Sequence, residues 1–210
     1  MIKCLVFDLD GTLIMWRDEY KYLMKDVFNR LNIEYTLDDI DNIDNAIETY
    51  EDIYDIYTKE NLLNHINKNC NLNLPLEFVS LLIEKQQECY VYDQKLYDTI
   101  EYLSTKYELV VLTNWFKESQ VGRLKGCKIY DFFKFVSCGD ERELKPNKKA
   151  FDVILKKYNP KECIMIGDSV KKDISPALQL GFDVILVKPN VKKKRKYKVI
   201  DNIYELKEML

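Results

Sequence analysis

Glycine and proline are scarce in this chain, with 6 and 5 copies among its 210 residues. Between Gly11 and Gly122 there is no glycine, and Pro75 is the one proline of that stretch. An all-β segment of this length needs more turn residues, so we predict that the stretch is mostly helical. Apolar residues at helical spacing agree with this, and they predict three or four amphipathic helices over roughly residues 17–91.

Long apolar runs are also missing. The start MIKCLVFD reaches an acidic residue at Asp8, which is too early for a signal peptide, and no later run approaches the length of a membrane span. We therefore expect a cytoplasmic protein with no membrane partner. The six cysteines form no C-x-x-C pair, so neither a disulfide framework nor a zinc site is expected.

No single sign of charge dominates, since 32 Lys and Arg stand against 35 Asp and Glu. With 47% hydrophobic residues, this balance favours an ordinary globular protein over a disordered one. The basic stretch VKKKRKYK at 191–198 follows the last predicted strand. We interpret it as a solvated loop, and we expect no nucleic-acid partner.

Short apolar runs appear outside the helical block, each separated from the next by a segment of helical character. The runs are IKCLVF, ELVVLT, FFKFVS, ECIMIG and FDVILV. This alternation predicts an α/β fold with a doubly wound, mostly parallel sheet and helices on both faces. Sheets of this kind bind ligands beyond the carboxyl ends of their strands, where the strand order reverses.

Polar residues suited to catalysis follow these runs, as the architecture predicts for a site. They are Asp8 and Asp10 after the first run, Thr113 and Asn114 after the second, Lys145 after the third, and Asp168 and Asp173 after the fourth. Two like charges about 4 Å apart repel by about 4 kcal/mol at an effective dielectric near 20. Three carboxylates at one edge of the sheet therefore need a cation.

Oxygen ligands without histidine or thiolate suit a hard divalent ion, and Mg²⁺ keeps coordination positions open for water and a substrate phosphate. We therefore predict a magnesium cofactor. Together with Lys145, it would offset the negative charge of the carboxylates and of a phosphoryl group.

The pair Asp8 and Asp10 suggests a division of labour. One aspartate can attack phosphorus and form a covalent intermediate, which splits the hydrolysis into two easier steps. A carboxylate two residues further on can protonate the leaving oxygen and later deprotonate water. Gly11 permits the tight turn that follows.

These motifs and their order resemble the haloacid dehalogenase superfamily, and specifically its phosphatase branch with a helical cap inserted after the first motif. The resemblance implies a catalytic core at 1–15 and 92–210 and a helical cap at 16–91. It implies that Asp8 is the nucleophile and Asp10 the general acid and base, whose backbone carbonyl also reaches the metal. Thr113, with Asn114 beside it, would hold the phosphoryl group, and Lys145 would steady nucleophile and phosphate. Asp168 would bind the metal directly, and Asp173 would lie behind the direct ligands.

The function implied is a magnesium-dependent phosphatase that hydrolyses a small organic phosphate monoester through an aspartyl-phosphate. In the family, the dehalogenases lack the second acidic residue of the first motif, so Asp10 points to phosphoryl transfer. Two alternatives stay open: a sugar phosphomutase of the same fold, and a non-catalytic binding protein that retains the fold. Trp16, Arg17 and Trp115 are candidate substrate contacts, although large aromatic residues also pack hinges.

Overall fold

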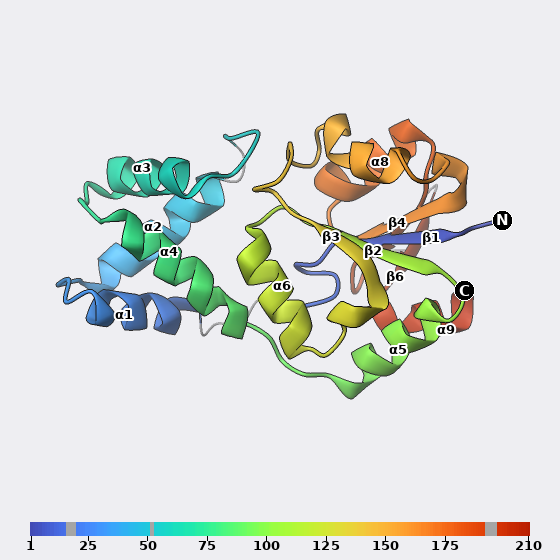
Figure 1. Cartoon of the computed structure of the whole chain (residues 1–210), viewed down its shortest axis with the longest axis horizontal. Helices are drawn as coiled ribbons and strands as arrows, with labels where there is room; N and C mark the ends of the chain where they lie inside the picture. Colours follow the sequence, from blue (N-terminus) through green and yellow to red (C-terminus); the bar gives the residue numbers. More distant parts are fainter. Residues whose placement is uncertain (16–19, 51–52, 192–196) are drawn as a thin grey trace.

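The computed structural model describes residues 1–15, 20–50, 53–191 and 197–210. A six-stranded sheet with helices on both faces forms one part, and helices α1 to α4 lie together beside it (Figure 1). The predicted α/β fold is confirmed.

The sheet is parallel throughout, with the strand order β3-β2-β1-β4-β5-β6. Starting from β1 in the centre, the chain first builds outward through β2 and β3 and then crosses over to β4, β5 and β6. The strand order therefore reverses between β1 and β4, which are hydrogen-bonded neighbours. The strands are β1 (Cys4–Phe7), β2 (Glu108–Leu112), β3 (Phe133–Ser137), β4 (Cys163–Gly167), β5 (Asp183–Val187) and β6 (Lys198–Ile200).

Each face of the sheet has its own apolar core, because successive side chains of a strand point to opposite faces. In β1, Leu5 and Phe7 pack on the face covered by α5 (Gln94–Ser104) and α6 (Lys117–Gly126). The alternate residues Cys4 and Val6 pack on the other face, against residues of α7 and α8. Both faces of the central strands are buried, which is why their sequences read as unbroken apolar runs.

The remaining helices of the sheet layer are short. They are α7 (Asp152–Leu155), α8 (Ser175–Leu180) and α9 (Leu206–Met209). Short helical turns lie between the longer elements: η1 (Gln86–Glu88), η2 (Tyr130–Phe132), η3 (Lys148–Phe151), η4 (Pro160–Glu162), η5 (Val170–Ile174) and η6 (Ile203–Glu205). Within the described residues, no helix has the length and apolar character needed to cross a bilayer.

The helical block predicted near residues 17–91 contains four helices, in agreement with the spacing of its apolar residues. They are α1 (Tyr20–Arg30), α2 (Leu37–Tyr50), α3 (Lys59–Cys70) and α4 (Leu76–Lys85). Their buried faces form one apolar cluster, which continues into Trp115, Phe116 and Leu144 of the sheet layer. The four helices are thus packed onto the sheet layer through a shared apolar contact, and the boundary at residues 16–91 stays a prediction.

Strand β6 was not predicted. The basic run was expected to follow the last strand, but Lys198 belongs to β6, which pairs with β5 at the edge of the sheet. A three-residue edge strand, one of whose residues is lysine, carries no apolar run that a sequence pattern can detect. Residues 192–196 of the basic run lie outside the described residues, so its interpretation as a solvated loop stays a prediction.

Candidate active site

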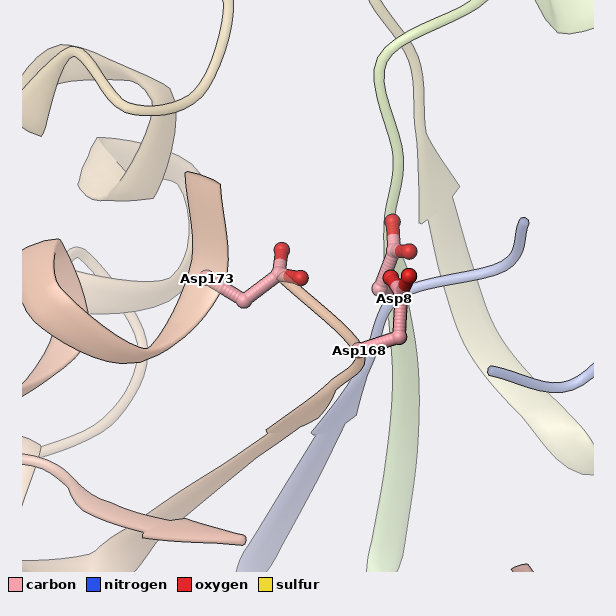
Figure 2. A group of neighbouring side chains, drawn as sticks. All are labelled: Asp8, Asp168 and Asp173. Atoms are coloured by element: carbon pink, nitrogen blue, oxygen red, sulfur yellow. The ribbon is translucent and has the colours of Figure 1, made fainter. Parts of the chain in front are cut away.

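Three carboxylates meet at the carboxyl edge of the sheet. Asp8 directly follows β1 and Asp168 directly follows β4, and these neighbouring strands pair Phe7 with Ile166. One oxygen from each of Asp8, Asp168 and Asp173 lies within 4.8 Å of the other two (Figure 2). The structure thus brings these carboxylates together at the point where the strand order reverses, which is where such folds bind ligands.

Asp173 comes from η5, a π-helical turn that begins just after β4. Its side chain is buried, and its Oδ2 accepts a hydrogen bond of 3.1 Å from the backbone N–H of Ser169. Ser169 also caps this turn, because its hydroxyl accepts from the backbone N–H of Lys172. The turn therefore carries Asp173 back toward the strand ends, close to Asp8 and Asp168. That Asp173 lies behind the direct metal ligands stays a prediction.

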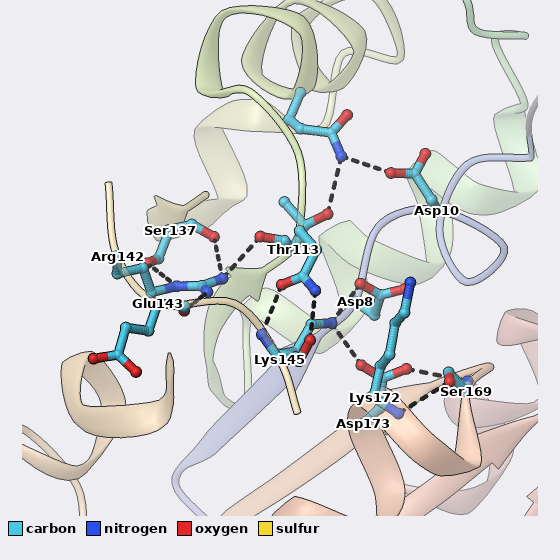
Figure 3. Close-up of polar contacts among 12 residues, drawn as sticks. Asp8, Asp10, Thr113, Ser137, Arg142, Glu143, Lys145, Ser169, Lys172 and Asp173 are labelled. Atoms are coloured by element: carbon cyan, nitrogen blue, oxygen red, sulfur yellow. Dashed lines mark hydrogen bonds and ion pairs between the residues drawn. The ribbon is translucent and has the colours of Figure 1, made fainter. Parts of the chain in front are cut away.

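Lys145 contributes a buried cation to this cluster. It lies in the loop after β3 and is only 3% exposed. Its Nζ donates to Asp8 Oδ1 at 2.6 Å and to Asp173 Oδ1 at 2.5 Å (Figure 3). One ammonium group therefore bridges two of the three carboxylates.

Asn114 contacts the backbone of Lys145, and its predicted role beside Thr113 stays a prediction. Its side-chain amide donates to the backbone carbonyl of Lys145 at 2.7 Å and accepts from the backbone N–H of the same residue at 2.9 Å. This two-point contact joins the end of β2 to the lysine loop. Asn114 thus fixes the backbone from which the Lys145 side chain extends.

Burial and mutual repulsion shape the charges of the cluster. Burial raises the pKa of Asp8 to about 8, although the Lys145 ammonium lowers it, and the charge of Asp173 raises it further. The pKa of Asp168 is also raised, first by burial and then by Asp173. Burial alone would lower the pKa of Lys145, but the charges of Asp173 and Asp8 outweigh it and raise that pKa. When ionised, the three carboxylates carry more negative charge than the Lys145 ammonium offsets, and a divalent cation would offset the remainder.

Two glycines let the backbone come close to these carboxylates. Gly11 has φ +74°, and a Cβ at this position would lie 2.8 Å from Asp168 Oδ2. A Cβ at Gly167 would lie 2.4 Å from Asp173 Oδ2. Any larger residue at either position would displace a carboxylate of the cluster.

Asp10 stands apart from the three carboxylates. Its Oδ2 accepts a hydrogen bond of 2.6 Å from Gln120 Nε2, and its Oδ1 accepts from Arg123 Nη1 (Figure 3). Both donors are fully buried residues of α6. Asp10 is therefore held toward α6, and its negative charge adds to the raised pKa of Asp8 two residues earlier.

Thr113 lies between Gln120 and Arg142. Its hydroxyl accepts from Gln120 Nε2 at 2.9 Å, and its backbone carbonyl accepts from Arg142 Nη2 at 2.8 Å. Arg142 also donates from Nε to the Ser137 hydroxyl at 2.9 Å, so it bridges the ends of β2 and β3. Burial lowers the pKa of Arg142 to about 10.

Sequence reasoning missed Gln120, Arg123 and Arg142. In α6 the buried polar residues interrupt the apolar face, so no periodic pattern marks them. Arg142 lies in a charged loop, where an arginine is commonplace. The structure shows Arg123 fully buried in a helix that exposes its other charges, and a buried arginine needs a partner, but no sequence pattern marked it.

Of the three candidate substrate contacts, the structure describes Trp115. Trp115 is 3% exposed, packs into the apolar cluster of α1 to α4, and donates from Nε1 to Gln86 Oε1 at 2.6 Å. Its place in the structure is that of a packed residue at the junction between the four helices and the sheet layer. Trp16 and Arg17 lie outside the described residues.

Comparisons with known proteins agree on one family. The family model described as haloacid dehalogenase-like hydrolase matches residues 2–181. Among curated proteins, the putative HAD-hydrolase YfnB of Bacillus subtilis (strain 168) is 26% identical over 100 residues, which are 46% of this chain and 43% of YfnB. The glyceraldehyde 3-phosphate phosphatase of Methanothermobacter thermautotrophicus is 30% identical over 123 residues, 53% of this chain and 54% of that enzyme. The matches span about half the length of these relatives or less.

Solved structures match over almost the whole chain. The structure of YfnB bound to magnesium has a TM-score of 0.81 at 20% identity and covers 100% of this chain and 98% of YfnB, which shows a shared fold. A HAD phosphatase from Thermococcus onnurineus has a TM-score of 0.66 at 25% identity, covering 99% of this chain and 97% of that one.

Proposed function

Because the chain belongs to the haloacid dehalogenase-like hydrolase family, we propose that it is a magnesium-dependent phosphatase. The proposed reaction is hydrolysis of a small organic phosphate monoester through an aspartyl-phosphate on Asp8. The similarity to a glyceraldehyde 3-phosphate phosphatase and to a HAD phosphatase supports this reaction class.

One observation carries the proposal. The Asp8 carboxylate lies at the carboxyl end of the central strand β1. Lys145 Nζ contacts it at 2.6 Å, and the carboxylates of Asp168 and Asp173 lie beside it. A carboxylate that only caps a helix or ends a strand has no need of a buried ammonium and two further acids. This arrangement suits a nucleophile that must meet an anionic phosphoryl group.

The chemistry of the donor set fits Mg²⁺. The candidate direct ligands are carboxylate oxygens of Asp8 and Asp168, with Asp173 behind them, and such oxygens are the hard donors that Mg²⁺ prefers. The raised pKa values of Asp8 and Asp168 reflect buried charge that a divalent cation would stabilise. A bound Mg²⁺ would neutralise part of the charge of the phosphoryl group and fix its orientation. We propose that the backbone carbonyl of Asp10 completes the protein ligands, as the family resemblance implies.

The residues of the chain then have the following roles. The carboxylate of Asp8 attacks phosphorus, and the bond from phosphorus to the ester oxygen breaks. Lys145 holds the carboxylate in place and balances the charge of the incoming phosphoryl group. The hydroxyl of Thr113 donates to a phosphoryl oxygen. Asn114 acts only indirectly, by fixing the backbone of Lys145.

Asp10 moves the protons. In its protonated form it gives a proton to the leaving ester oxygen, and as the resulting carboxylate it takes one from the water that attacks phosphorus, so that inorganic phosphate leaves and both Asp8 and protonated Asp10 are restored. A carbon-halogen bond needs no such proton donor, since halide leaves as an anion. The presence of Asp10 therefore favours a phosphatase over a dehalogenase.

We propose that residues 16–91 form a cap over this site, since helices α1 to α4 have their own apolar cluster and meet the sheet layer at Trp115, Phe116 and Leu144. Cap closure would exclude bulk water during transfer, and opening would release the product. The substrate contacts then come from the cap side, with Trp16 and Arg17 as the proposed candidates. Trp115 is better explained as packing.

The test is phosphate release by the purified chain with Mg²⁺, measured on a panel of phosphorylated metabolites that includes glyceraldehyde 3-phosphate, sugar phosphates and nucleoside monophosphates. Asp8→Asn is expected to reduce turnover to background, because the amide is not a nucleophile. Chelation of divalent metal should do the same, reversibly. Mass spectrometry after an acid quench should find a phosphoryl group on Asp8.

Asp183→Asn is the matched control. Asp183 is exposed and begins β5, at the edge of the sheet opposite to the site, so this substitution should leave turnover unchanged. Full activity in Asp8→Asn or in excess chelator contradicts the mechanism. A sugar phosphate converted to an isomer without free phosphate would instead identify a phosphomutase. Chloride release from 2-chloropropionate would identify a dehalogenase.

A further inference from the structure

Helix α6 carries a hydrogen-bond network that includes Asp10. Arg123 Nη1 donates to Asp10 Oδ1 and, at 2.9 Å, to Gln120 Oε1. Gln120 Nε2 donates to Asp10 Oδ2 at 2.6 Å and to Thr113 Oγ1 at 2.9 Å. Each of these two nitrogens carries two hydrogens, so every contact uses one.

The network leaves Gln120 a single orientation. If its amide were turned over, Oε1 would face the Asp10 carboxylate, and two acceptors would meet with no hydrogen between them. The bond from Arg123 to Oε1 removes this possibility. Gln120 and Arg123 are both 0% exposed, so no solvent competes for these bonds. Asp10 and the Thr113 hydroxyl are therefore held in one fixed relation.

The same helix receives the segment that returns from the four helices. Arg123 Nε donates to the backbone carbonyl of Cys89 at 2.8 Å. A Cβ at Gly126 would lie 2.2 Å from the Tyr90 ring, and one at Gly122 would lie 2.5 Å from the Gln87 side chain. The two glycines thus let the segment at residues 87–90 pack directly on the backbone of α6. Arg123 lies between this segment and Asp10.

We propose that Arg123 and Gln120 are positioning residues for proton transfer: they orient the Asp10 carboxylate, and Gln120 also orients the hydroxyl of Thr113. This inference rests on the proposed phosphatase function and on the role of Asp10 in it. Asp10 precedes Gly11 in a turn, and its side chain is 24% exposed. Such a side chain has several rotamers open to it, and the two donors on α6 select one.

If the ion pair of Arg123 and Asp10 only stabilised the fold, its loss would affect turnover in a different way. Loss of folded protein or of general rigidity lowers the turnover of every substrate by the same factor. Loss of oriented proton donation depends on the leaving group, because an alkoxide needs a proton to leave and a nitrophenolate does not. The comparison of an alkyl phosphate with p-nitrophenyl phosphate therefore separates the two roles.

The experiment measures kcat/KM, which reports the steps up to departure of the leaving group, for both esters at saturating Mg²⁺. In Arg123→Met we expect a loss of about 100-fold toward the alkyl phosphate, the lower end of what general acid catalysis contributes, and of less than about 5-fold toward p-nitrophenyl phosphate. Gln120→Met should show the same selectivity with a loss of about 10-fold. Arg123→Lys, which retains a cation near Asp10, should recover part of the alkyl phosphate activity.

Lys125→Met is the matched control, because Lys125 is an exposed residue of the same helix and should leave both values unchanged. If Arg123→Met does not fold, Gln120→Met and Arg123→Lys carry the test. Equal losses for the two esters, or no loss, would overturn the inference. Failure of the wild-type chain to release phosphate from either ester would instead overturn the proposed function, so the two failures are distinguishable.

Discussion

Replacing Lys145 with methionine tests the electrostatic account of the site most directly. The side chain keeps its length, but Asp8 and Asp173 lose the ammonium that lies 2.6 Å and 2.5 Å from them. At an effective dielectric near 20, each contact corresponds to about 6 kcal/mol of gross Coulomb attraction. Much of this is offset by the cost of burying the ammonium. Removing one partner from a buried ion pair typically costs about 3–5 kcal/mol, because the remaining charge is left uncompensated.

The loss should depend on pH in a defined direction. Burial already raises the pKa of Asp8 to about 8, and without the ammonium this pKa rises further. At pH 6 Asp8 can therefore take up a proton, which limits the cost of the substitution. At pH 9 the wild-type protein has Asp8 ionised and Lys145 still charged, since the pKa of Lys145 is raised above its ordinary value. We expect the full loss of about 3–5 kcal/mol at pH 9 and a clearly smaller one at pH 6.

The assay is urea unfolding of the metal-free protein at both pH values, repeated with Mg²⁺. Added Mg²⁺ should stabilise Lys145→Met more than it stabilises the wild type, because the variant leaves more negative charge for the ion to neutralise. The control Lys149→Met removes an exposed lysine paired with Glu143 and should change little. A loss at pH 9 below about 1 kcal/mol, or one equal at pH 6 and pH 9, would refute the reasoning.

Two further outcomes are expected. Because the pKa of Asp8 in the folded state, about 8, lies above its unfolded value, the folded metal-free protein binds the extra proton. Its urea midpoint should therefore fall as the pH rises from 6 to 9, and Asp8→Asn should remove this slope; an unchanged slope in that variant contradicts the assignment. Gly11→Ala places a methyl group 2.8 Å from Asp168 Oδ2 at φ +74°, and we expect weaker Mg²⁺ binding by calorimetry together with a stability loss of about 1–2 kcal/mol. Gly181→Ala, at φ +90° with its nearest neighbour 3.7 Å away, should show a similar stability loss without an effect on Mg²⁺; equal effects on Mg²⁺ would argue against the contact.

The sheet and the positions of its polar strand ends could be predicted from the sequence because both follow from local patterns. A strand buried on both faces gives an apolar run, and parallel strands place their carboxyl ends at one edge. Asp8 and Asp168 follow such runs, so their approach to each other needed only the fold class. The short edge strand β6 carries no such run, which is why it was missed.

The surroundings of Asp10 could not be predicted in the same way. Gln120 and Arg123 lie more than a hundred residues from Asp10 along the chain, and a contact of this kind leaves no trace in hydrophobic periodicity. Asn114 shows a second limit. Its position after β2 was predicted, but an amide at a strand end can face a ligand or a neighbouring backbone equally well, and only the structure shows that it bonds the backbone of Lys145.

The central place of β1 also bears on local opening of the molecule. Both of its edges are occupied, by β2 on one side and β4 on the other. Fraying that starts at either border of the sheet must separate other strands before it reaches the backbone of Asp8. We therefore expect the amides of β1 and β4 to exchange last, so that Asp8 stays anchored while peripheral elements exchange their hydrogens with solvent.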